Sequence, residues 1–117
     1  MGAEELLKRY AAGERDFSGA VLEISGLNNI TLSNATLRGA CLAGANLIDA
    51  DLSGADLSEA DLSAAILMRA NLTNVKLKDA NLRWASLVNA TPADVDLIGA
   101  VLSRTILPKG APLHVQT

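Results

Sequence analysis

The residues best able to do chemistry form one acidic cluster near the middle of the chain. It consists of Asp49, Asp51, Asp56, Glu59 and Asp61. Carboxylates at this density could hold a metal ion, because hard cations prefer oxygen ligands. They could also form a phosphate-like acidic surface. Which of these holds depends on the elements that carry the five side chains.

The other residues capable of catalysis are isolated. Cys41 has no histidine nearby, and a cysteine nucleophile needs an activating base or an electropositive setting. His114, the only histidine, lies in a proline-flanked tail. We therefore expect no enzyme activity, no catalytic residue and no cofactor.

A five-residue repeat organises nearly the whole chain. From Phe17 to Leu107 every fifth residue is leucine, apart from Phe17 itself and Pro92, and no insertion breaks the register. A second series, two residues earlier, is alanine at thirteen of nineteen positions. A period of five matches neither the 3.6 of a helix nor the 2 of a strand, so the chain is a repeat architecture.

Steric reasoning explains the two series. In an extended segment the leucine and the alanine two residues before it point the same way. Two inward and three outward residues per unit predict a short strand followed by a corner. Repeated corners wind the chain around one axis, with both series filling the centre. Alanine is needed because the converging walls leave room for one large and one small side chain each.

The units at 45–49, 50–54, 55–59 and 70–74 read ANLID, ADLSG, ADLSE and ANLTN. They resemble the A(D/N)LXX signature of pentapeptide-repeat proteins. The resemblance covers residues 15–109 and implies an all-β fold, a right-handed quadrilateral β-helix with four units, or twenty residues, per coil. The repeat would then make nearly five coils.

The segment 1–14 before the repeat predicts a short capping α-helix. Leu6, Leu7 and Tyr10 share one helical face, and Gly13 follows where a helix C-terminus favours glycine. We expect this helix to lie over the first coil and to block its open edge.

The segment 110–117 is predicted to be a C-terminal tail. Leu113 and Val115 either fold back as a plug or leave the last coil open. An open coil would allow a second copy of the chain to stack on it, which makes a homodimer through the C-terminal coil one candidate assembly.

Three departures from the repeat lie close together. Pro92 replaces leucine, while Val75 and Val95 exceed alanine at the small position. We interpret the two valines as filling space that the smaller proline leaves empty.

Stacking changes the interpretation of the acidic cluster. If a coil has twenty residues, basic side chains lie above or near three of the carboxylates. The pairs are Asp49 with Arg69, Asp56 with Lys76, and Glu59 with Lys78. Paired surface charges contribute little to stability, and outward side chains on different walls suit no shared metal. We therefore predict no metal site.

Apolar residues gather on the outside of the third wall. Six of them should form a continuous exposed strip on that wall and its adjoining corner: Ile48, Ile66, Met68, Trp84, Val88 and Ile106. Soluble monomers rarely expose such a patch, and tryptophan and methionine are favoured at interfaces. The strip predicts an interface with a partner protein or a second copy. The alternative is ordinary packing between neighbours on one sheet.

Charge bears on the remaining functions. Some pentapeptide-repeat proteins imitate DNA and block DNA gyrase, which requires a persistent negative face. Here the net charge is only −3, with 13 acidic and 10 basic residues. Arg38, Lys76 and Lys78 interrupt the wall that carries Asp56 and Asp96. No face gathers enough basic residues for nucleic acid. We predict a protein-binding scaffold of unknown partner, with a gyrase-directed DNA mimic and a structural spacer as the alternatives.

The sequence also bears on location. It has no apolar run long enough to span a membrane and no apolar block typical of a signal peptide. Its single cysteine cannot form an internal disulfide. We therefore expect a cytoplasmic protein without membrane contact.

Overall fold

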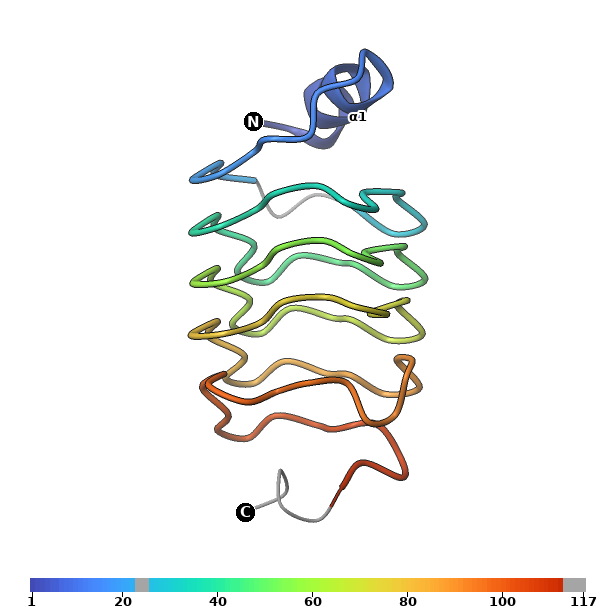
Figure 1. The fold of residues 1–117 in the computed structure, drawn as a ribbon, viewed down its shortest axis with the longest axis vertical. Coiled ribbons are helices and arrows are strands. Elements are labelled where there is room, and N and C mark those ends of the chain that lie inside the picture. Colours follow the sequence, from blue (N-terminus) through green and yellow to red (C-terminus); the bar gives the residue numbers. More distant parts are fainter. Residues whose placement is uncertain (23–25, 113–117) are drawn as a thin grey trace.

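The computed structural model describes residues 1–22 and 26–112, which form a rod with extents of 41 × 20 × 19 Å (Figure 1). A helix lies at one end of the rod, and the chain descends in stacked layers to the other end. The predicted plug of Leu113 and Val115 lies outside the described residues, as do Ser25 and His114.

Parallel bridges join residues twenty apart, in four columns along the rod. The columns begin with the bridges of Asp16, Val21, Gly26 and Thr31 to the residues twenty positions later. We call these columns walls 1 to 4, and each stretch of twenty residues a layer. Wall 1 is centred on positions 17, 37, 57, 77 and 97, and walls 2, 3 and 4 follow at intervals of five.

The pairing within each wall is minimal. In the described residues it consists of isolated bridges, with no continuous strand. In every described unit except that of Leu97, the residue before the central one forms the bridge, because the corner takes up most of the five-residue unit. The short strands predicted from the repeat are therefore reduced to single bridging residues.

The two inward series fill the interior of most of the rod as predicted. Leu57 is 0% exposed and Ala60 is 1% exposed, and similar values recur along most of the described repeat. Toward the C-terminal end, Ala100, Leu102 and Leu107 are only partly buried. One large and one small aliphatic side chain per unit thus form a continuous core. This packing supplies most of the apolar burial that stabilises the chain.

Most of the described corners are tight turns closed by one backbone hydrogen bond. In the first, the N–H of Ala20 donates to the carbonyl of Phe17 at 3.1 Å, and Gly19 between them has φ +70°. A positive φ at the third residue is typical of a type II turn. The equivalent residue has a positive φ at most other corners, including Asn29 and Trp84.

The aspartate or asparagine of the signature has a structural role. Asp56 Oδ1 accepts a hydrogen bond from the backbone N–H of Ser58 at 3.0 Å, across the central leucine. The same bond recurs from Asp51 to Ser53 at 3.0 Å. It provides an acceptor for an N–H that forms no backbone hydrogen bond to a neighbouring layer among the described residues.

The helix α1 spans Ala3–Ala11. Its C-terminus forms a Schellman motif, in which Glu14 N–H donates to the carbonyl of Arg9 and Gly13 N–H to that of Tyr10, both at 3.0 Å. Gly13 has φ +100°, which explains why glycine is favoured there. In the described part of the chain, no helix is long and apolar enough to cross a membrane.

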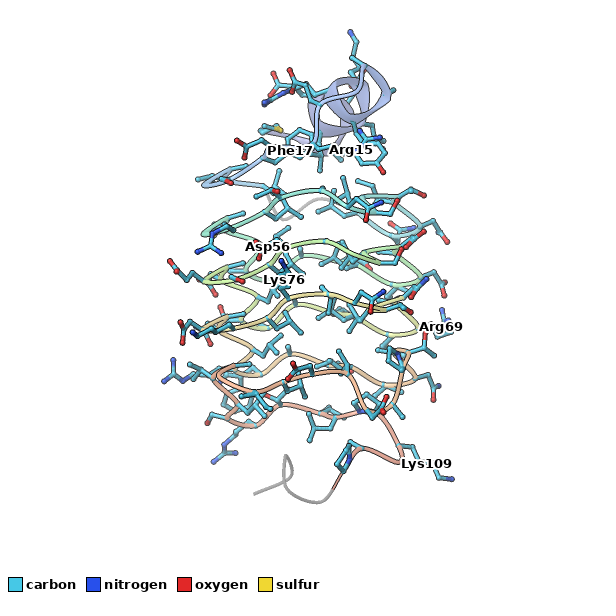
Figure 2. All side chains as sticks on the ribbon, in the orientation of Figure 1. Arg15, Phe17, Asp56, Arg69, Lys76 and Lys109 are labelled. Atoms are coloured by element: carbon cyan, nitrogen blue, oxygen red, sulfur yellow. The ribbon has the colours of Figure 1, made fainter. Side chains whose placement is uncertain are left out.

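Contacts from α1 reach the walls beneath it. Leu6 is fully buried, and the Tyr10 hydroxyl donates to the carbonyl of Ser33 at 2.8 Å. Arg15 occupies a small, inward position of the repeat, yet it is exposed and its guanidinium stacks 3.6 Å from the Tyr10 ring centre. Figure 2 shows Arg15 and Phe17 directly below the helix.

The unit that contains Pro92 changes the register of wall 1. The Thr91–Pro92 peptide is cis, and Asp94 lacks the positive φ of most other corners. The N–H of Asp79 donates to the carbonyl of Gly99 at 3.0 Å. The equivalent bond one layer earlier joins Glu59 to Lys78, so the partner here is one residue late.

The bridge between Lys76 and Asp96, expected from the repeat, is missing from the described residues. Val75 and Val95 are buried, each 6% exposed. A slot of about 450 Å³ nevertheless opens beside Val75 on wall 1. Neither Pro92 nor Val95 lines this slot, so the proposed filling of space beside Pro92 stays a prediction.

Candidate interaction surface

The acidic cluster is divided among separate contacts. Arg69 Nε and Nη2 donate to the two carboxylate oxygens of Asp49 at 2.8 and 3.1 Å, as the stacking predicted. This hydrogen bond with Arg69 lowers the pKa of Asp49 below its ordinary value. Arg69 is visible at the edge of the rod in Figure 2.

The other two predicted neighbours are placed as expected, because Asp56 bridges Lys76 and the N–H of Glu59 donates to the carbonyl of Lys78, but their charged groups do not pair with each other. Arg38 lies 3.4 Å from the Asp56 carboxylate and 3.3 Å from that of Glu59. Although Lys76 stacks on Asp56 (Figure 2), its ammonium makes no ion pair in the described structure, and neither does that of Lys78. Partial burial opposes ionisation of Asp56, but hydrogen bonds from Ser58 and Arg38 outweigh it and lower the pKa of this carboxyl.

The remaining carboxylates support their own turns. Asp51 and Asp61 each accept the N–H two residues later, at 3.0 Å. Within residues 1–22 and 26–112, no three acidic, histidine or cysteine side chains are grouped so that they could hold a metal ion. Cys41 is partly buried on wall 2 and bridges Val21 and Asp61, as the repeat predicted.

The predicted apolar strip lies on wall 3 and at its corner with wall 2. Ile66 bridges Ser86, which in turn bridges Ile106. Ile48, Met68 and Val88 form a parallel column, because their carbonyls accept hydrogen bonds at the equivalent position of successive layers.

The two columns differ in exposure. Ile66 is 37% exposed and Ile106 56%, whereas Ile48, Met68 and Val88 are half-buried. The half-buried column fits the alternative of packing between neighbours on one wall. The exposed column and Trp84 are therefore the part of the strip that is available to a partner.

Trp84 is the most exposed member of the strip, at 62%. It occupies the third position of its turn with φ +65°. Glycine and asparagine adopt this backbone region readily, while a bulky side chain does so rarely. The protein thus holds a large apolar ring outward at a position whose geometry favours a small residue.

One arginine contacts the tryptophan ring, and a second arginine precedes it in the sequence. The Arg104 guanidinium lies 5.1 Å from the Trp84 ring centre, within the range of a cation–π contact. Arg83, the preceding residue, is exposed. Neither guanidinium makes an ion pair among the described residues. The sequence interpretation omitted this basic rim, which adjacency to Trp84 and the spacing of twenty could have indicated.

Parallel bridges at a spacing of twenty, an aliphatic interior and turns at most of the described corners define a β-helical repeat solenoid. A family model described as pentapeptide repeats matches residues 16–54, 45–83 and 76–109 in eight copies. The chain belongs to the pentapeptide-repeat family.

Solved structures of the same family are similar to this chain. One is a pentapeptide-repeat protein from the thylakoid lumen of Arabidopsis thaliana, with 39% identity and a TM-score of 0.64 over 85% of this chain and 65% of that one. Another is HetL from the cyanobacterium Nostoc sp. strain PCC 7120, involved in heterocyst differentiation regulation. It has 36% identity and a TM-score of 0.56 over 77% of this chain and 46% of HetL.

This chain thus spans less than two thirds of either protein's length. A comparison with curated protein sequences found no match.

Proposed function

We propose that this protein is a non-enzymatic scaffold that binds a partner protein through the exposed part of the wall 3 strip. The observation that carries this proposal is Trp84, a ring 62% exposed at a corner with φ +65°. Arg69 and Arg104 have the same backbone conformation at other corners, so the exposure of the aromatic ring, rather than its φ, is what indicates binding. Tryptophan is also among the residues that contribute most to binding energy at interfaces.

The surroundings of Trp84 indicate the chemistry of the partner. Ile66 and Ile106 offer apolar surface on wall 3, and Arg104 supplies positive charge beside the ring. Arg83 adds an exposed basic residue immediately before the tryptophan in sequence. A matching surface would have an apolar centre with carboxylates on the side that meets the arginines. A second copy of the chain is a less suitable occupant of this surface, because it would bring the same arginines toward each other if the two strips met face to face.

The alternative functions have weaker support. A DNA mimic that acts on gyrase would need a continuous acidic face, but Arg38, Lys76 and Lys78 lie among the carboxylates of wall 1. A structural spacer would need no exposed tryptophan. We place the protein in the cytoplasm, as its sequence suggests.

We further infer a solenoid of nearly five coils in which α1 caps the first. The burial of Leu6 and the hydrogen bond of Tyr10 to Ser33 support the cap. The terminal ammonium of Met1 also donates to the carbonyl of Val21 at 2.8 Å. A helix docked in this way would shield backbone groups at the first edge from pairing with other chains.

The experiment is affinity capture from the source cell with a double variant, Trp84→Asn with Ile106→Thr. Asparagine suits the corner backbone and threonine suits a wall, so the fold should persist. The matched control is Val21→Thr, which replaces an apolar side chain that is 64% exposed on wall 2 by a polar one of similar size. We expect a specific partner to be captured by the wild type and the control, and to be lost with the double variant.

A purified partner identified in this way should then bind the wild type in solution, with a salt-dependent association rate that decreases in Arg83→Gln. If wild type, control and double variant capture the same proteins, wall 3 is not the binding surface. If none captures any protein, the spacer alternative is favoured.

A further inference from the structure

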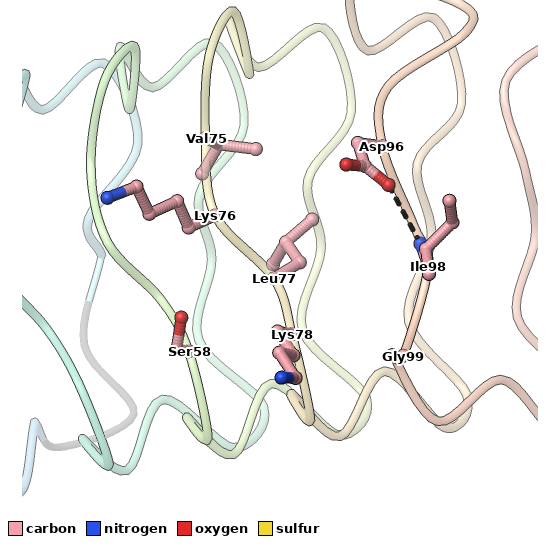
Figure 3. A pocket seen from close by; sticks show the side chains of 8 residues that line it. All are labelled: Ser58, Val75, Lys76, Leu77, Lys78, Asp96, Ile98 and Gly99. Atoms are coloured by element: carbon pink, nitrogen blue, oxygen red, sulfur yellow. Dashed lines mark hydrogen bonds between the residues drawn. The ribbon is translucent and has the colours of Figure 1, made fainter.

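The slot on wall 1 lies where the register of the ladder changes. It has a volume of about 450 Å³, within the usual size range of ligand sites. Figure 3 shows it between the segment 75–78 and the segment 96–99, with Ser58 on the layer before. Register shifts of one residue in a sheet are often found next to functional sites.

The slot exposes backbone groups that are paired elsewhere on wall 1. One layer earlier, Leu57 N–H donates to the carbonyl of Lys76, and Lys76 N–H donates to that of Ala55. By repeat equivalence, the N–H of Leu77 and the carbonyl of Val75 point toward the next layer. Among the described residues neither has a backbone partner, and the N–H and carbonyl of Asp96 opposite also lack one.

The slot is lined by apolar side chains and, at its edges, by charged ones. Val75 and Leu77 belong to the core and form part of the slot, and Ile98 at its outer edge is 76% exposed. Lys76 and Lys78 lie on one side of the slot and Asp96 on the other (Figure 3). A ligand with both a negative and a positive group would match this arrangement.

The slot is closed at one end. Asp79 N–H donates to the carbonyl of Gly99 at 3.0 Å, and a Cβ at Gly99 would lie 3.3 Å from Lys78 Cγ. The two segments therefore meet at this corner, and only one bridge, that between positions 76 and 96, is missing along wall 1. A whole strand of a partner would find its path blocked, whereas a small molecule would fit.

We propose that this slot binds a small zwitterionic ligand containing one peptide group, of which a dipeptide with small apolar side chains is the simplest example. Its peptide N–H would donate to one of the unpaired carbonyls, that of Val75 or of Asp96, and its peptide carbonyl would accept from an unpaired N–H on the opposite side of the slot, that of Asp96 or of Leu77. Its carboxylate would be placed toward the lysines and its ammonium toward the Asp96 carboxylate, with the side chains over Val75 and Ile98. This binding site is separate from wall 3.

The test is a titration of the ¹⁵N-labelled protein with L-alanyl-L-alanine, followed by amide NMR. We expect saturable shifts confined to residues 75–78 and 96–99, with millimolar or tighter affinity. L-alanine, which has no peptide group, and the N-methylated dipeptide, which has no peptide N–H, should each bind about tenfold more weakly. Absence of saturable shifts with the dipeptide at about 10 mM, or equal binding of all three molecules, would overturn the proposal.

Two substitutions separate the site from the general surface. Asp96→Asn should weaken dipeptide binding about tenfold. Asp61→Asn is its matched control and should leave binding unchanged, because Asp61 has the same position in its unit and accepts the same type of 3.0 Å bond on wall 2. Equal effects of the two substitutions would contradict the assignment.

Pro92→Leu tests the slot itself. A leucine restores the repeat unit and should favour the regular register, which would remove the slot and the binding. Dispersed amide signals would verify that this variant is folded. Retained binding by a folded Pro92→Leu variant would count against the proposal, and if the variant does not fold, the comparison of Asp96→Asn with Asp61→Asn decides.

Discussion

The guanidinium of Arg69 donates two hydrogen bonds, of 2.8 and 3.1 Å, to the carboxylate of Asp49, twenty residues earlier. Such a bidentate pair fixes the relative position of two successive corners at the edge between walls 3 and 4. Both side chains remain largely in contact with water, so the pair acts locally and is sensitive to salt.

The first prediction concerns the pH dependence of this pair. The hydrogen bond from Arg69 lowers the pKa of Asp49 from its usual 3.8. A carboxyl group whose pKa is lowered by folding stabilises the protein above the unfolded-state pKa, and this contribution is lost as pH falls through the folded-state pKa. Asp49→Asn should therefore be less stable than wild type at pH 7, with the difference disappearing in acid.

Urea unfolding at several pH values would measure the difference. Asp79→Asn is the control, because Asp79 occupies a corner with φ +62° but forms no ion pair in the described residues. A difference between wild type and Asp49→Asn that stays constant below pH 3.8 would contradict the assigned linkage.

A second prediction tests how α1 is attached. The Tyr10 hydroxyl lies 2.8 Å from the carbonyl of Ser33 and 3.1 Å from its Oγ. Tyr10→Phe keeps the ring under Arg15 but removes both contacts, and should lower the free energy of unfolding by about 1 kcal/mol. Ser33→Ala leaves the carbonyl contact and should cost less. Equal losses from the two variants would show that the carbonyl contact contributes nothing.

The fold was largely predictable because the five-residue spacing of leucine and alanine marks the side chains that fill the core. Leu57 and Ala60 are buried as the spacing required, and α1 ends where Gly13 indicated. The register shift between Asp79 and Gly99 was not predictable. It depends on the backbone conformation of the corner at Asp94, which the pattern of side-chain types does not specify.

The position of the apolar strip on wall 3 followed from the repeat, and its use as a binding site stays a prediction. The ion pairs of the acidic cluster were only partly predictable. Stacking placed Asp49 beside Arg69, where both side chains come from the same corner column. It missed Arg38, whose long side chain reaches carboxylates 18 and 21 residues later rather than 20. A flexible side chain selects among several neighbours, so column membership alone does not determine ion pairs. The partner and the cytoplasmic location stay predictions.

A third prediction tests the limit on side-chain size in the interior. Ala60 is 1% exposed among closely packed leucines. Ala60→Leu adds a branched side chain to this centre and should lower the free energy of unfolding by about 1–3 kcal/mol. The control, Ala43→Leu, makes the same change at a half-buried outward position on wall 2 and should cost less. Unchanged melting of Ala60→Leu would show that the site tolerates bulk.

The last prediction separates the effect of Trp84 on the free energy of unfolding from its effect on partner binding. Its φ of +65° is unfavourable for a bulky residue, is accepted by asparagine, and is worst for a β-branched side chain. Trp84→Asn loses the contact with Arg104 but gains a compatible backbone, so stability should stay within about 1 kcal/mol of wild type.

Trp84→Val removes the same ring, and its free energy of unfolding, measured with urea, should be about 1–2 kcal/mol lower than that of Trp84→Asn. Both substitutions should reduce partner binding equally, because both remove the exposed aromatic surface. If binding instead follows stability across the two variants, the tryptophan acts through the fold. Equal stability of the asparagine and valine variants would mean that this corner does not impose its left-handed conformation in solution.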